Sequence, residues 1–187
     1  MSELSHLRLM AAYNTWMNQK LYDAAATLPA HELAANRGAF FGSLLGTLNH
    51  LVAADTIWLR RFASHPARSG ALEAAQALAP PSALNAIYSD DLAVLAEHRR
   101  MLDGLIGSLT AQLADADLEH VLHYASTKGI ASQKRFGDLL LHLFNHQTHH
   151  RGQASTLLSQ AGADLGVTDL LMLIENVGDP AAPAAPA

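Results

Sequence analysis

The 187-residue sequence contains no cysteine. This absence excludes disulfide bridges, zinc sites built from thiolates and catalysis by a protein thiol. Any metal ion that the chain holds must therefore have nitrogen and oxygen ligands, which suit zinc, nickel, iron or manganese. If the reaction needs a thiol, that thiol must be supplied as a cosubstrate.

The sequence also lacks a basic stripe and a long apolar run. Its formal net charge is −5, with 12 Lys and Arg against 17 Asp and Glu, which argues against nucleic acid as a direct ligand. No apolar run approaches the length of a membrane span, and the N-terminus lacks a signal-peptide core. We therefore expect no membrane partner and a cytoplasmic location. Half of the residues are hydrophobic and 16% are charged, which is typical of a globular protein.

Apolar residues recur at helical spacing in four long segments. They predict helices over residues 2–28, 43–63, 83–113 and 137–161, with Ser2 and Ser43 as N-caps. The prediction is an all-α four-helix bundle, in which two long connections permit a departure from simple up-and-down order. Residues 1–178 form a single domain in this interpretation, and the tail 179–187, rich in Pro and Ala, is expected to be disordered.

Two smaller elements complete the predicted fold. The residues on either side of Lys128-Gly129 predict a β-hairpin over residues 121–134, inserted before the last long helix. We expect this hairpin to contribute little to the core, although such insertions often cover a site. Thr168 is expected to cap a short C-terminal helix over residues 169–176.

Four of the eleven histidines lie within nine residues of the last long helix. On a helical wheel, His146 and His150 fall in the middle of its apolar stripe. His142 and His149 fall at the edge of the stripe, and Arg151 falls on the far side. Imidazole is costly to bury unless its polar atoms are satisfied, and two histidines one turn apart point in the same direction. The pair therefore favours a metal ion over two histidines that only pack in the core.

Other polar residues on the predicted apolar faces have two interpretations each. His50, among small residues of the second helix, is either a satisfied core histidine or a third metal ligand with room for an ion beside it. Asn14 either fixes helix register or lines a cavity. Asp91 and His98 interrupt the stripe of the third helix, and each is either a further ligand or base or a residue at the solvent edge.

Several motifs resemble those of the DinB/YfiT family of metalloenzymes. They are Tyr13-Asn14-x-Trp16-x-Asn18 in the first helix, RGAFFGS and TLNHL at the second, NHQTHHRGQ in the last, and TDLL near the end. The resemblance implies a four-helix bundle in which three histidines hold a divalent ion. One of these histidines is on the second helix and two are on the last. Carried over residue by residue, the ligands are His50, His146 and His150.

The resemblance also implies a class of reaction. Relatives with assigned roles include transferases and isomerases that use a low-molecular-weight thiol (bacillithiol or mycothiol). Relatives are often homodimers, so the resemblance implies a homodimer here. We therefore expect a metal-dependent transferase or hydrolase with a small-molecule substrate, in which zinc, nickel or iron activates a thiol or water. Tyr13, Asp91 and Gln153 are candidates for its acid or base. The alternative is a metal-binding module without enzymatic activity, which binds a small molecule or a partner chain in a stress response.

Overall fold

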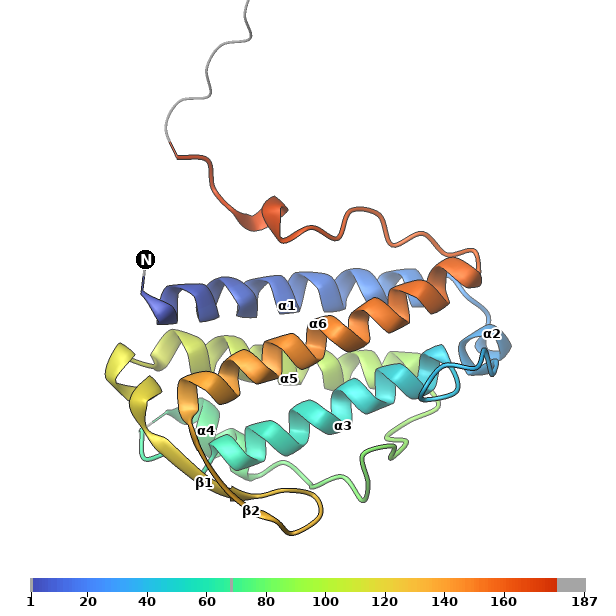
Figure 1. Cartoon of the computed structure of the whole chain (residues 1–187). Coiled ribbons are helices and arrows are strands. Elements are labelled where there is room, and N and C mark those ends of the chain that lie inside the picture. The colour runs from blue at the N-terminus through green and yellow to red at the C-terminus, as the bar shows by residue number, and fades with distance from the viewer. Residues whose placement is uncertain (1, 68, 178–187) are drawn as a thin grey trace, which may run out of the picture.

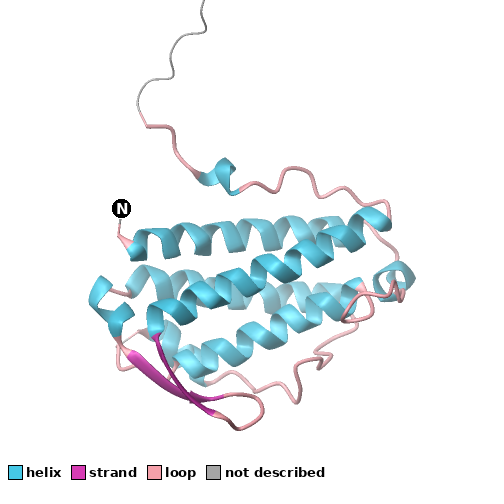
Figure 2. Cartoon of the chain, in the orientation of Figure 1, coloured by secondary structure: helices cyan, strands magenta, loops and turns pink. Residues whose placement is uncertain are grey.

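The computed structural model describes residues 2–67 and 69–177 (Figures 1 and 2). The expected tail, 179–187, lies outside these residues. The chain is mostly helical, which confirms the predicted class. The four long helices are α1 (Glu3–Ala25), α3 (Leu44–Phe62), α5 (Leu92–Gln112) and α6 (Phe136–Gln160). The shorter elements are helices α2 (Ala30–Ala34) and α4 (Gly70–Gln76), the 3-10 helices η1 (Asp115–Glu119) and η2 (Leu170–Leu173), and strands β1 (Val121–Ala125) and β2 (Ala131–Arg135).

The long helices surround one apolar core. Helix α1 packs against α5 and α6, and α3 packs against the same two helices, as Figure 1 shows. Leucines from each long helix are fully buried between them (Leu21, Leu48, Leu95, Leu102, Leu140 and Leu143). Because α6 lies between α1 and α3, two of its faces are buried. No helix in the described part of the chain is both long enough and apolar enough to cross a membrane.

Local hydrogen bonds explain where the helices begin. The Ser2 and Ser43 hydroxyls accept the backbone N–H groups of Ser5 and Gly46 at 3.3 and 3.0 Å, which confirms both predicted N-caps. The third helix was predicted to begin too early. Helix α5 starts at Leu92, and the carboxylate of Asp91 caps it by accepting the N–H of Ala93 at 2.8 Å.

The segment before α5 is held away from a helical path by a tertiary contact. The Asn49 side-chain oxygen accepts the N–H groups of Tyr88 and Ser89 at 2.7 and 3.2 Å, so these groups are not free for helical hydrogen bonds. The predicted C-terminal helix is also shorter than expected, since only the 3-10 turn η2 forms there. Thr168 does not cap it. Its carbonyl instead accepts the hydroxyl of Tyr13 at 2.7 Å, which ties the C-terminal segment to α1.

The predicted hairpin is confirmed. Strands β1 and β2 pair antiparallel, with Val121 opposite Arg135, and Gly129 adopts a positive φ of 77° in the connecting turn. The expectation that it contributes little to the core was wrong in one respect. Leu122 is 1% exposed and belongs to the core, because alternation along β1 turns its side chain toward the helices.

Candidate metal centre

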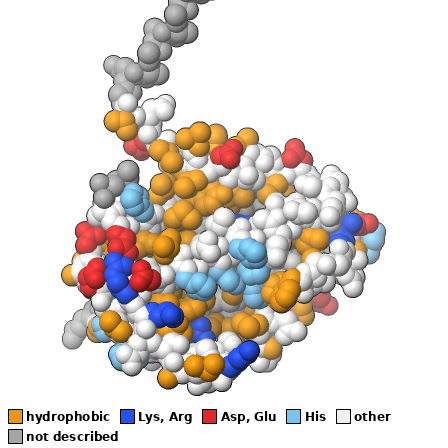
Figure 3. Space-filling model, in the orientation of Figure 1, with side chains coloured by type: hydrophobic (Ala, Val, Ile, Leu, Met, Phe, Trp, Pro, Cys, Tyr) orange, Lys and Arg blue, Asp and Glu red, His pale blue; other side chains and the backbone are white. Residues whose placement is uncertain are grey.

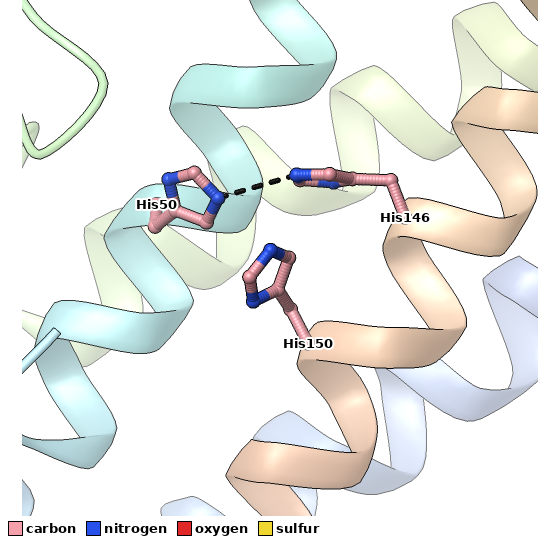
Figure 4. A group of neighbouring side chains, drawn as sticks. All are labelled: His50, His146 and His150. Carbon is pink, nitrogen blue, oxygen red and sulfur yellow. Dashed lines mark hydrogen bonds between the residues drawn. The ribbon is translucent and has the colours of Figure 1, made fainter. Parts of the chain in front are cut away.

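Three histidines from two helices converge on one point (Figure 4). His50 comes from α3, and His146 and His150 come from successive turns of α6. The Nε2 atoms of His50 and His146 are 3.3 Å apart, and one ring nitrogen from each of the three residues lies within 4.8 Å of the other two. The structure thus brings together the three residues that the sequence predicted as ligands.

The loop before α3 packs against this cluster. The ring of Phe41 stacks on His50, with centroids 3.8 Å apart and an angle of 18° between the planes, and its edge faces His150 at 5.5 Å. Gly42 follows with a φ of 76°, a conformation that favours glycine and turns the chain into α3. Phe41 therefore shields one side of the histidines from solvent.

Hydrogen bonds fix the orientation of two of the rings. The Nδ1 atom of His50 lies 2.8 Å from the carbonyl oxygen of Leu84, and that of His150 lies 2.8 Å from the side-chain oxygen of Gln153. Because both oxygens can only accept, both Nδ1 atoms donate and carry the proton. The lone pairs of these two rings are therefore on Nε2, the atom left for a metal ion.

The electrostatics of the cluster favour neutral rings. Burial and, to a smaller extent, the neighbouring His150 and His50 together lower the pKa of His146 to about 3. Burial also lowers the pKa of His50 and of His150. Neutral imidazole is the form that binds metal ions, so the rings need not lose a proton at neutral pH before binding one.

The donor set fits a divalent cation. Two nitrogen ligands of a tetrahedral ion, each about 2.0–2.1 Å from it, are about 3.3 Å apart, which matches the separation of the His50 and His146 Nε2 atoms. The Nδ1 atom of His146 is buried without a hydrogen-bond partner among the described residues. A cluster of neutral imidazoles with inward lone pairs is therefore a candidate metal centre.

A cavity of about 220 Å³ adjoins the cluster. Its wall includes Trp58 and Arg61 of α3, Tyr124 and Thr127 of the hairpin region, and His146. The hairpin region thus covers one side of the site, as such insertions were expected to do. In Figure 3, histidine side chains form a band across the middle of this face of the molecule.

The flanking histidines lie outside the cluster. His142 lines the cavity and packs edge-on against Trp58, with ring centroids 5.0 Å apart. His149 is exposed, and its ring lies 4.8 Å from that of His150. His98 is not part of the group, and its ring packs against that of Tyr88 with centroids 5.0 Å apart.

The three acid or base candidates are in different environments. Tyr13 donates its hydroxyl to the Thr168 carbonyl, and Asp91 caps α5. Neither side chain lines the cavity beside His146. Gln153 contacts a cluster histidine, but it does so by accepting the His150 proton, which is an orienting contact.

A buried charge network behind the histidines was not predicted from the sequence. The Arg99 guanidinium is 1% exposed and lies 2.7 Å from the Asp55 carboxylate and 3.0 Å from that of Asp103. Asn14 and Asn18 each donate to Asp103 at 2.9 Å. Burial lowers the pKa of Arg99, but the two carboxylates outweigh burial and the net shift is upward. The polar interruption at Asn14 was the only sign of this network in the sequence.

The network extends to the helix that carries the histidine pair. Gln147, which follows His146, donates to the Asp55 carboxylate, and Arg151, which follows His150, donates to the Asn14 side-chain oxygen. Burial lowers the pKa of Arg151 to about 10. Arg151 does lie on the side of α6 away from the histidines, but that side is buried against α1. The network therefore holds α6 in one rotational setting about its axis.

Comparison with known proteins assigns the chain to a family. The sequence model of the DinB family matches residues 1–179. The chain belongs to the DinB family. It is similar to Protein DinB of Bacillus subtilis (strain 168), with 27% identity over 158 residues that cover 84% of this chain and 87% of that protein. A crystal structure of a DinB-like protein from Bacillus cereus ATCC 10987 has the same fold. It aligns with a TM-score of 0.58 and 21% identity, over 83% of this chain and 91% of that one.

Proposed function

We propose that this member of the DinB family is a metal-dependent enzyme whose divalent ion is held by His50, His146 and His150. The observation that carries the proposal is the convergence of three imidazole nitrogens, two of them 3.3 Å apart, at the edge of a cavity. Three protein ligands leave at least one position for a substrate or water, which is the arrangement of catalytic rather than closed structural sites. Zinc, nickel and iron all suit imidazole ligands.

When bound, a divalent ion would lower the pKa of a coordinated water or thiol and so provide a nucleophile at neutral pH. The chain's own residues orient the site and cover one side of it. Leu84 and Gln153 hold two rings through their Nδ1 protons, and Phe41 covers the outer face of His50. We propose a small-molecule substrate in the adjoining cavity and either water or a low-molecular-weight thiol as the nucleophile.

We also propose that α1, α3, α5 and α6 form the four-helix bundle that the sequence predicts. The contacts of α1 and α3 with both α5 and α6 support this arrangement. In such a bundle, sites are built from side chains on facing helices, as His50 on α3 and the histidine pair on α6 are here. The charge network on the other side of α6 keeps the pair directed at α3.

The test is turnover by protein loaded with one metal at a time. Zinc, nickel and iron(II) forms are assayed against a panel of thiols with electrophiles and a panel of esters and amides. We expect turnover in at least one panel, its loss in His150→Ala and its retention in His149→Ala, because only His150 belongs to the cluster. Metal-loaded protein that turns over neither panel would instead favour the alternative, a binding module without enzymatic activity.

A further inference from the structure

Arg61 lies in the wall of the cavity that adjoins His146. Its guanidinium carbon is 4.6 Å from the centroid of the Trp58 ring and 5.1 Å from that of Tyr124. Within the described residues, no Asp or Glu side chain is within ion-pair distance of it. Arg61 is therefore a cation whose neighbours are aromatic and whose charge has no acidic partner in this part of the chain.

Two other arginines, Arg60 and Arg99, have hydrogen-bond or ion-pair partners of a kind that Arg61 lacks among the described residues. Arg60 donates to the carbonyl oxygens of Gln76, at 3.2 Å, and of Leu78, and Arg99 lies between two carboxylates. Arg61 is half-buried, and burial lowers its pKa, so its charged form has lost part of its hydration without gaining an anion. A partly desolvated guanidinium binds an added carboxylate more strongly than one in open solvent.

Arg61 lines both the cavity beside His146 and a neighbouring hollow. A larger hollow of about 640 Å³ shares Ile57, Arg61, Leu84 and Thr127 with the cavity beside His146. Arg61 therefore stands where the two spaces join. A small molecule that extends from this hollow into the cavity lies beside the guanidinium, with its leading end toward His146.

We propose that Arg61 binds a carboxylate of the substrate while the opposite end of the substrate reaches the three-histidine site. This inference rests on the proposed function and names its substrate class, a small carboxylic acid with a metal-reactive group at the other end. A guanidinium donates through a planar fork that matches the two oxygens of a carboxylate. Among the described residues that line the two spaces, Arg61 is the one cation without a hydrogen-bonded partner, because Arg60 is bonded to backbone carbonyls, and one cation matches one negative charge.

The experiment uses cobalt-substituted protein and matched thiol probes. Thiols of two, three and four carbons are titrated, each as its terminal carboxylate and as its neutral amide, and binding is followed by the cobalt absorption spectrum. We expect one chain length at which the carboxylate binds about tenfold or more tightly than the amide, since hydrogen bonds to charged groups contribute about that much. In Arg61→Met this preference should disappear while the affinity for the amide stays the same.

Arg100→Met is the matched control, because Arg100 is an exposed arginine of α5 that lines neither space. It should keep the preference. Equal binding of carboxylate and amide by the wild type at every length would overturn the inference and leave the metal site standing. A preference that persists in Arg61→Met would mean that the probe chelates cobalt through sulfur and oxygen, which also overturns it. A wild type that binds no cobalt would show that the proposed function itself has failed, and the inference with it.

Discussion

Replacing Arg99 by Leu should destabilise the protein severely. The substitution removes the cation between the Asp55 and Asp103 carboxylates, which are 0% and 4% exposed, and leaves both without an ion-pair partner among the described residues. Breaking a buried ion pair in this way costs about 3–5 kcal/mol. Against a total stability of about 5–15 kcal/mol this is a large share. At about 2–4 °C per kcal/mol for a chain of this size, the melting temperature should fall by roughly 6–20 °C.

The assay is urea unfolding at pH 7, followed by circular dichroism, on Arg99→Leu and on the control Arg100→Leu. Arg100 is the next residue on α5 and is exposed, so its substitution should change the free energy of unfolding by less than about 0.5 kcal/mol. Adding Asp55→Leu and Asp103→Leu to Arg99→Leu should recover part of the loss, because the uncompensated charges are then gone. A cost below about 1 kcal/mol for Arg99→Leu would refute the reasoning, since it would mean that water reaches the carboxylates.

Three further changes test the surroundings of the site. In the metal-free protein, burial is the main reason that the pKa of His146 falls from 6.5 to about 3. Between these two pH values the imidazole is therefore neutral in the folded chain and protonated in the unfolded chain. The free energy of unfolding should therefore fall by about 1.4 kcal/mol per pH unit as the pH falls through that window. In His146→Asn, the free energy of unfolding measured in urea should fall less steeply from pH 7 to 4. Gly46→Ala places a methyl group against the Phe41 carbonyl and should lower the stability by about 1–3 kcal/mol in thermal melts. The control Gly104→Ala places its methyl group in open space and should be neutral or stabilising in the same assay. Ser43→Ala removes the N-cap of α3 and should cost about 1 kcal/mol by urea unfolding, and no measurable loss would mean that water replaces the hydroxyl.

The sequence predicts best what a single helix determines. His146 and His150 could be found because one element carries both and its apolar period places them together. His50 could not be distinguished from a core histidine by local pattern alone, since its partners are on another helix, and family resemblance was needed to select it. The tertiary arrangement then brings its Nε2 to 3.3 Å from that of His146.

The errors of the sequence analysis have tertiary causes. Leu84 and Tyr88 precede α5 at helical spacing from its apolar residues, yet the helix starts only at Leu92. The reason is that the side chain of Asn49 on α3 accepts hydrogen bonds from backbone N–H groups of the preceding segment. The buried position of Arg99 could not be predicted either. Charged residues on a helix usually face solvent, and although Asp103 follows Arg99 at i,i+4 on α5, no local pattern shows that Asp55 of α3 will also face Arg99.

The most direct test of the metal centre is the metal content of the purified protein and its single alanine variants, prepared without chelator and measured by elemental analysis. We predict one divalent ion per chain in the wild type and a strong loss in His50→Ala, His146→Ala and His150→Ala. His142→Ala and His149→Ala should keep the ion, because neither ring belongs to the converging group. Full retention in His150→Ala, or complete loss in His149→Ala, would contradict the assignment of the three ligands.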